Sequence, residues 1–197
     1  MKLYYSAASP YVRKVMACAI ARDIEGFITK IPTNPHLSPA NLINDNPLSK
    51  VPCLVTDDGF ALFDSPVICE YLDCVDNALP MFPAALPARW VALKYQAIGD
   101  GIMDAAVGRR MEQAKPAEDA RTAGMERLKA AIDRALASLE LDPPGRALDI
   151  GSITIGCALG YLDFRFAHEP WREAHPRLAA WFKTIETERA FAETMPA

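Results

Sequence analysis

The sequence predicts a chain in two parts, a small mixed α/β domain followed by an all-helical domain. Strand-like and helical segments alternate as far as residue 76, and only helical periodicity follows residue 87. The stretch between them carries prolines at positions 80, 83 and 87, which is typical of a linker. We therefore expect domains at residues 1–76 and 88–197, joined by a linker at 77–87.

The first part is expected to form a small sheet with helices on its faces. Its predicted order is strand 2–5, helix 10–22, strand 27–31, a short helix at 39–44, strands 53–56 and 61–63, and helix 65–75. Asp57-Asp58-Gly59 separates the last two strands and predicts a hairpin between them.

The second part shows helical patterns at 88–113, 118–141, about 150–166, 176–187 and 188–193. Asp149 and Ser152 have the spacing of a capping box at the start of the third of these helices. Leu148 and Ile153 stand where a hydrophobic staple would form. We read this motif as structural.

Composition excludes several classes of function. The chain has 197 residues and a net charge of −4, and this mild acidity argues against a nucleic-acid binder. Its longest uncharged segment, 150–162, is too short to span a membrane. The five cysteines form no CxxC motif, which indicates packed, reduced thiols in a cytoplasmic protein. The three histidines lack the spacing of metal ligands, so we expect no metal.

Two helices of the first part begin with the same device, Ser9-Pro10 and Ser65-Pro66. Serine is a good N-cap and proline suits the first helical position. Neither helix has an acid three residues after its serine, so neither start supplies its own anion. Helix N-termini bind anions, and helices that follow strands of one sheet tend to open at one edge. The pair predicts a shared anionic ligand, or else Ser-Pro simply starts each helix well.

Pro52 raises a third question, because it begins the strand at 53–56 and cannot donate a hydrogen bond to the sheet. A cis bond at Val51–Pro52 would turn the chain there. The backbone N–H and C=O of Val51 would then lie beyond the sheet edge. An extended peptide could pair with these two groups as a neighbouring strand does.

These segments together resemble a known family. Ser9-Pro10-Tyr11-Val12 stands where glutaredoxins and thioredoxin-like domains carry a Cys-Pro-Tyr-Cys motif, with serine in place of the first cysteine. With Lys50-Val51-Pro52, Asp64-Ser65 and an all-helical second half, the chain resembles bacterial soluble glutathione S-transferases over essentially its whole length. The resemblance implies a thioredoxin-like βαβ-ββα domain followed by a helical bundle.

The resemblance also implies roles for particular residues. Ser9 matches the residue that hydrogen-bonds the glutathione sulfur, and Val51, before a cis Pro52, matches the residue that pairs with the tripeptide backbone. Asp64 and Ser65 match the residues that hold the γ-glutamyl end. Lys50 lies close to the same expected site.

Thiol chemistry agrees with such a site. A thiol with a pKa near ~8.5 is only a few per cent thiolate at pH 7, and the thiolate is the nucleophile. A hydroxyl donor at a helix N-terminus stabilises the thiolate. Because Ser9 has no thiol, a mixed disulfide cannot form at this position, which argues against glutaredoxin-like exchange. Ser6 is a rival donor, and Tyr4 or Tyr5 is a further alternative, since some branches of the family use tyrosine.

The implied function is a glutathione transferase acting in detoxification, with glutathione as co-substrate and a small hydrophobic electrophile. We expect the electrophile pocket between the sheet edge and the first two long helices, at Met103, Val107 and Arg110, although these residues equally fit a core or a dimer contact. The family resemblance implies a homodimer. Arg13 is expected to tie its helix to the helical domain.

Several questions stay open at this point. Asp100 and Asp104 could reach a glutathione amine or simply face solvent, and Asn34 and His36 could border the glycine end. A regulatory glutathione-binding protein with little activity, or a glutathione-dependent peroxidase or isomerase, would carry the same motifs.

Overall fold

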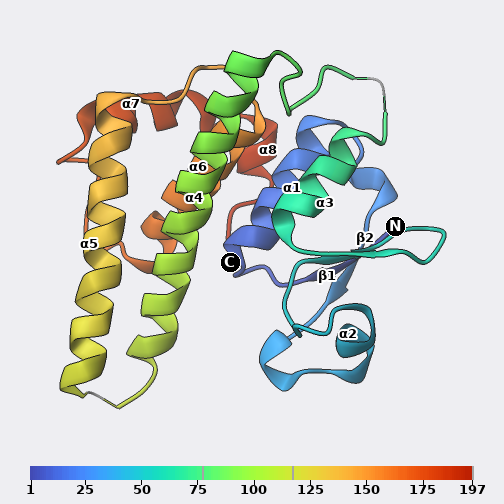
Figure 1. The fold of residues 1–197 in the computed structure, drawn as a ribbon, viewed down its shortest axis with the longest axis horizontal. Helices are drawn as coiled ribbons and strands as arrows, with labels where there is room; N and C mark the ends of the chain where they lie inside the picture. The colour runs from blue at the N-terminus through green and yellow to red at the C-terminus, as the bar shows by residue number, and fades with distance from the viewer. Residues whose placement is uncertain (77, 117, 197) are drawn as a thin grey trace. The chain divides into compact units, whose positions relative to one another are not determined.

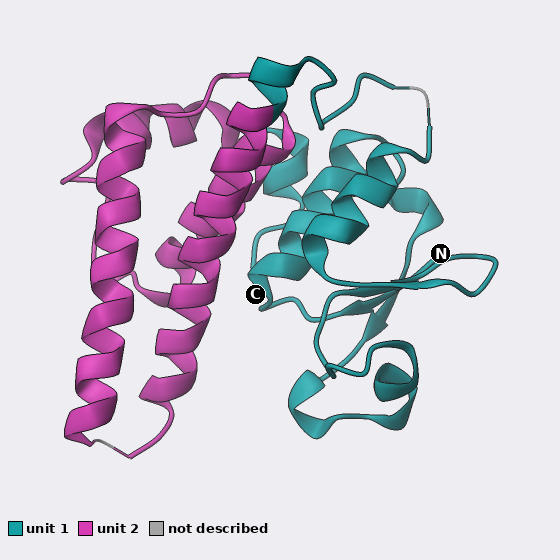
Figure 2. Cartoon of the chain, viewed as in Figure 1, with its two compact units in different colours: residues 1–89, 188–197 teal, residues 90–187 magenta. Residues whose placement is uncertain are grey.

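The computed structural model describes residues 1–76, 78–116 and 118–196 (Figure 1). Asn77 of the expected linker, and Ala117 and Ala197 of the expected helical domain, lie outside the described residues. The chain forms two compact units (Figure 2). Unit 1 comprises Met1–Arg89 and Glu188–Ala197, and unit 2 comprises Trp90–Thr187. The expected domain boundaries at 76 and 88 stay a prediction.

Unit 1 is built on a four-stranded sheet in the order β2-β1-β3-β4. Its strands are β1 (Lys2–Tyr5), β2 (Thr29–Pro32), β3 (Cys53–Val55) and β4 (Ala61–Leu62). β1 pairs with β2 in parallel and with β3 in antiparallel orientation, and β3 and β4 form the predicted hairpin. Gly59 has φ +88° in the hairpin turn, a conformation that favours glycine.

Helices cover both faces of this sheet. They are α1 (Pro10–Ala21), α2 (Ala40–Asp45) and α3 (Ser65–Asp73), with 3₁₀ turns at Glu25–Phe27 and Pro35–Leu37. A fourth short helix, α8 (Arg189–Ala192), contacts α1. Figure 1 shows α1 and α3 on one side of the sheet and α2 on the other. The strands alternate accordingly: Leu3 and Leu54 are fully buried, while Tyr4 and Cys53 pack in a cluster with Leu42 of α2.

Many element boundaries differ by one or two residues from the sequence-based prediction, and two differences have a clear local cause. The strand expected at 27–31 starts at Thr29, because the N–H groups of Phe27 and Ile28 close a 3₁₀ turn onto Ile24 and Glu25. The second Ser-Pro helix is capped by Asp64 and not by Ser65. The Asp64 carbonyl accepts the first helical bond, from the Ile68 N–H at 3.0 Å, so Ser65 is already helical.

The described residues of unit 2 form the helices α4 (Leu86–Gln113, beginning in unit 1), α5 (Asp119–Leu141), α6 (Ile150–Arg165) and α7 (Pro176–Ile185). α6 is almost wholly buried. Its predicted capping box is confirmed: Asp149 Oδ1 accepts from the Ser152 N–H at 2.8 Å, and Ser152 Oγ accepts from the Asp149 N–H at 3.0 Å.

Two glycines let α4 and α6 approach closely. A Cβ atom at Gly99 would lie 2.9 Å from the Thr154 carbonyl carbon, and one at Gly151 would lie 2.7 Å from the Ala92 carbonyl oxygen. Each position therefore needs the absence of a side chain. The two glycines therefore set the distance between α4 and α6 in unit 2.

Fold class is confirmed by this architecture: a mixed sheet with helices comes first, and helices follow. Four of the five cysteines are buried, as expected for packed thiols, whereas Cys74 is exposed. Among the described residues, no helix has the length and apolar character needed to cross a membrane.

Candidate functional site

The strand directions bring three of the predicted segments to one edge of the sheet. β1 and β4 run the same way, because each is antiparallel to β3. Their carboxyl ends therefore lie at the same edge, where α1 follows β1 and α3 follows β4. β3 runs the opposite way, and its first residue, Cys53, pairs with Tyr4 at this edge. The Ser9 turn, Val51–Pro52 and Asp64-Ser65 converge there.

Ser9 is the N-cap of α1, as predicted. Its Oγ accepts a hydrogen bond from the Val12 N–H at 3.3 Å, and its own N–H donates to the Ser6 carbonyl at 3.1 Å. The first turn of α1 contains no acidic residue, so its N-terminal charge is not neutralised from within the turn. The side chain of Ser9 is partly exposed. The helix start therefore presents a hydroxyl and a partial positive charge.

Tyr4, one of the alternative donors, is committed elsewhere. Its hydroxyl donates to Asp45 Oδ2 at 2.6 Å on the face toward α2, and it also lies 3.1 Å from the Asn41 carbonyl oxygen. Burial, reinforced by the hydrogen bond to Asp45, raises the pKa of Tyr4 to about 12. Tyr4 therefore pins α2 to the sheet, which weighs against it as a sulfur donor.

The Val51–Pro52 peptide bond is cis. The Val51 side chain packs against the cluster of Tyr4, Leu42 and Cys53, while its backbone N–H and C=O make no hydrogen bond within the described part of the chain. Both peptide groups are thus open to a partner. Lys50, just before them, has an exposed side chain.

Asn46 holds this loop in shape, a role that the sequence analysis missed. Its side chain is 1% exposed; Nδ2 donates to the Lys50 carbonyl at 2.9 Å and Oδ1 accepts from the Leu48 N–H at 3.0 Å. The available signal was the Asn46-Pro47 dipeptide, since Asn-Pro favours the start of a turn. Asn46 therefore acts on the edge only through the backbone next to Val51.

The start of α3 supplies an acid and a second hydroxyl. Asp64 is exposed, and its carboxylate makes no capping bond. Ser65, the first helical residue, is 1% exposed. The Phe63–Asp64 peptide bond is cis. The Asp64 carboxylate can bind an ammonium group, and the helix N-terminus beside it can bind a carboxylate.

The remaining predicted residues belong to unit 2 or have local partners. Met103, Val107 and Arg110 follow one face of α4; Met103 is fully buried, Val107 is half-buried and Arg110 is exposed. Their assignment to a second-substrate pocket stays a prediction. Asn34 Oδ1 accepts from the His36 N–H at 3.0 Å and thereby caps the short turn that follows β2.

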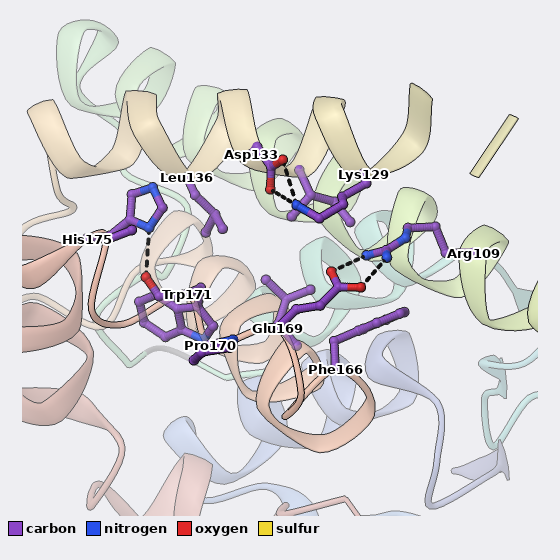
Figure 3. Close-up of a pocket in the computed structure, with 12 residues that line it drawn as sticks. Arg109, Lys129, Asp133, Leu136, Phe166, Glu169, Pro170, Trp171 and His175 are labelled. Carbon is purple, nitrogen blue, oxygen red and sulfur yellow. Dashed lines mark hydrogen bonds and ion pairs between the residues drawn. The ribbon is translucent and has the colours of Figure 1, made fainter. Parts of the chain in front are cut away.

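A cleft of about 420 Å³ in unit 2 is a separate feature that the sequence analysis did not foresee (Figure 3). Arg109 binds Glu169 through two hydrogen bonds of 3.0 and 2.6 Å, and Lys129 binds Asp133 at 2.8 Å. Because these charges neutralise one another in pairs, the cleft offers a weaker case for chemistry than the sheet edge. None of the predicted site residues lines it. In the part of the chain that the structure describes, no group of three His, Cys, Asp or Glu side chains could hold a metal.

Comparisons with known proteins cover both units. The family description "Glutathione S-transferase, N-terminal domain" matches residues 8–74, and "Glutathione S-transferase, C-terminal domain" matches residues 118–184. The uncharacterized GST-like protein YibF of Escherichia coli (strain K12) is 35% identical over 202 residues, covering 100% of this chain and 98% of that protein.

Two further matches differ in what they cover. A crystal structure of a glutathione transferase family member from Pseudomonas fluorescens Pf-5, with bound glutathione, is 38% identical with a TM-score of 0.92 and covers 100% of this chain and 98% of that one. Elongation factor 1-gamma of Danio rerio is 28% identical over 185 residues, which are 87% of this chain but 41% of that protein.

Proposed function

The chain belongs to the glutathione S-transferase family, and we propose that it is a glutathione transferase whose sheet edge binds glutathione and activates its thiol. The observation that carries the proposal is the convergence of Ser9, the open peptide groups of Val51 and the start of α3 on one edge. The bound glutathione in the relative from Pseudomonas fluorescens supports the choice of ligand.

In this proposal Ser9 is the catalytic residue. Its hydroxyl donates a hydrogen bond to the glutathione sulfur, and the N-terminus of α1 adds a partial positive charge beside it. Both favour the thiolate over the thiol. Each unit by which the thiol pKa falls corresponds to about 1.4 kcal/mol of preferential binding of the charged form. The thiolate then attacks the electrophile, while Ser9 itself forms no covalent bond.

The rest of the edge suits an extended tripeptide with charged ends. Val51, next to Pro52, pairs with the peptide backbone as a strand would. Asp64 binds the ammonium group of the γ-glutamyl end, and Ser65 with the first amides of α3 binds its carboxylate. Lys50 brings a cation close to the same ligand.

The second substrate is a small hydrophobic electrophile. Met103, Val107 and Arg110 are its proposed contacts, because they place two apolar side chains and a cation on one face of α4; Val107 and Arg110 are accessible there, while Met103 is fully buried. We also propose a homodimer in the cytoplasm, on the resemblance to the family.

A second candidate function is glutathione binding with little turnover. The match to elongation factor 1-gamma favours it, because that name is not one of a transferase. A glutathione-dependent peroxidase or isomerase is a third possibility, since the same thiolate would serve either reaction. These three functions share the same bound thiolate and differ in whether it reacts and with which substrate.

Retention on immobilised glutathione and conjugation of glutathione to an aromatic halide separate these functions. Retention with turnover is the expected result. Retention without turnover of the halide, a hydroperoxide or an isomerisable substrate would favour the binding protein. Absence of both retention and turnover would overturn the proposal.

A further inference from the structure

We infer that the C-terminal segment at residues 188–196 positions the Ser9 end of α1, and that it does so through Arg13. The inference rests on the proposed function, because it concerns the orientation of the same hydroxyl. Arg13 is a positioning residue here and does not itself touch the reacting atoms.

The segment packs within unit 1, although it follows unit 2 in the chain. Its short helix, α8, contacts α1 directly. Arg189 of α8 binds Asp23 at 2.7 Å and also pairs with Glu25, and both acids follow the C-terminal end of α1. This ion-pair cluster anchors the segment at the end of α1 that is remote from Ser9.

Arg13 anchors the segment at the other end of α1. Its Nε donates to Thr194 Oγ1 at 3.3 Å, its Nη2 donates to the Phe191 carbonyl at 3.3 Å, and its guanidinium lies 6.0 Å from the centre of the Phe191 ring. The sequence analysis expected Arg13 to tie its helix to the helical domain; Phe191 and Thr194 fall in the range expected for that domain but belong to unit 1 of the structure.

The surroundings of Arg13 are unusual for a buried cation. Its residue exposure is 7%, and among the described residues it makes no ion pair. Its Nη1 is buried without a hydrogen-bond partner. Burying an arginine without a carboxylate costs free energy. This cation is held by two neutral oxygen atoms and an aromatic ring, all from the C-terminal segment.

The backbone of Arg13 connects this anchor to the proposed catalytic residue. Its N–H donates to the Ser9 carbonyl at 3.0 Å, and the preceding N–H, of Val12, donates to Ser9 Oγ. Val12, Arg13 and Thr194 also line one small cleft beside the turn that leads to Ser9. Fixing the Arg13 side chain therefore fixes the first turn of α1 and the direction of the Ser9 hydroxyl.

Small displacements at such a position matter, because a shift of about 1 Å at a reacting group can cost on the order of a hundredfold in rate. We expect loss of the Arg13–Thr194 contact to misalign the hydroxyl and the first amides of α1 with the sulfur. The thiol pKa of bound glutathione would then rise toward its value in water. Loss of the Arg189 anchor would loosen only the remote end.

The test compares Arg13→Gln and Thr194→Val with the control Arg189→Gln, and Thr194→Ser serves as the conservative variant. Each full-length protein is titrated with saturating glutathione while the ultraviolet absorbance of the thiolate is followed, and its melting temperature is recorded. We expect Arg13→Gln and Thr194→Val to raise the thiol pKa by about half a unit, which is about threefold in thiolate population below the pKa. Thr194→Ser should keep the wild-type pKa. Arg189→Gln should keep it too while melting at a lower temperature.

Thr194→Val keeps the arginine in place, so it tests the contact even where Arg13→Gln fails to fold. An unchanged thiol pKa in a folded Thr194→Val protein would overturn the inference, and so would an equal rise in Arg189→Gln. A wild-type protein that does not lower the thiol pKa of glutathione would instead overturn the proposed function itself.

Discussion

The hydroxyl oxygen of Ser9 accepts a hydrogen bond from the Val12 N–H at 3.3 Å, so the helix cap uses a lone pair of this hydroxyl and not its proton. Within the described residues no acceptor takes that proton. One side chain can therefore cap α1 and still donate to a ligand. The two tasks do not compete, which is why a serine suits this position in the proposed mechanism.

Ser9→Ala removes both the cap of α1 and the proposed hydrogen-bond donor to the sulfur. We expect the thiol pKa of bound glutathione to rise and the conjugation rate below that pKa to fall, while the protein loses about 1 kcal/mol of stability with the cap. Ser9→Thr keeps a hydroxyl in the same place and should preserve most of both. The measurement is the pH–rate profile of conjugation. A profile that Ser9→Ala leaves unmoved would remove Ser9 from the mechanism.

We expect the capping box of α6 to affect the stability of the protein and not its affinity for glutathione. Asp149→Ala should cost about 0.5–2 kcal/mol of unfolding free energy, because the Ser152 N–H loses its acceptor at the start of a buried helix. Asp149→Asn keeps an acceptor oxygen and should cost less. Chemical denaturation measures the loss, and glutathione affinity should stay at the wild-type value. A variant that binds glutathione more weakly while keeping its stability would contradict this assignment.

Gly99 and Gly101 form a matched pair on α4. Gly99→Ala should destabilise the protein by about 1–3 kcal/mol, since its Cβ would lie 2.9 Å from the Thr154 backbone. A Cβ at Gly101 meets nothing within 4 Å, so Gly101→Ala should raise stability by up to about 1 kcal/mol through better helix propensity. Melting temperatures of the two variants should move in opposite directions. A rise in both melting temperatures would show that α4 and α6 can separate to make room for the Cβ at position 99, and a fall in both would contradict the prediction for Gly101.

Glu169 provides a prediction about pH. The hydrogen bonds from Arg109 hold the pKa of Glu169 below its usual range. A carboxylate with a lowered folded-state pKa adds stability above its unfolded pKa of about 4.3 and loses that contribution as the pH falls through the folded value. Glu169→Gln should therefore destabilise the protein at pH 7, and its deficit should shrink as the pH falls below about 4.

The control for this pair is Asp133→Asn, which removes an exposed pairing with Lys129 in the same cleft. Exposed pairs contribute little, so its stability should stay close to wild type across the same range. Urea denaturation at several pH values measures both variants. A Glu169→Gln deficit that grows in acid would have the wrong sign for this ion pair.

Local chemistry explains which elements could be predicted from the sequence. Ser9 and Asp149 each accept a hydrogen bond from the backbone N–H three residues later, so a short sequence motif is enough to predict both caps. The N-cap of the second Ser-Pro helix was misplaced by one residue, because Asp64 and Ser65 are both good N-caps and proline fits either of the next positions. The Asn46 contacts are local too, but asparagine has many roles in loops.

Contacts between residues far apart in the sequence could not be predicted from local motifs. Arg13 and Thr194 are 181 residues apart, and no periodicity or spacing links them. The sequence predicts strands at 2–5 and 53–56, yet the antiparallel pairing of β1 and β3, which brings Val51 to the Ser9 edge, depends on the whole sheet. At the candidate site, Pro52 by itself suggested that a peptide could pair with Val51, whereas the γ-glutamyl contacts proposed for Asp64 and Ser65 came from the family resemblance.

The return of residues 188–197 to unit 1 has a consequence for synthesis and handling of the protein. A ribosome makes β1 and α1 before unit 2, and Phe191 and Thr194, the partners of Arg13, only after it, so the N-terminal unit can complete its packing only once unit 2 has been synthesised. A purification tag attached directly behind this segment would begin within a few residues of Thr194, a partner of Arg13. Placing such a tag at the opposite terminus would spare that contact.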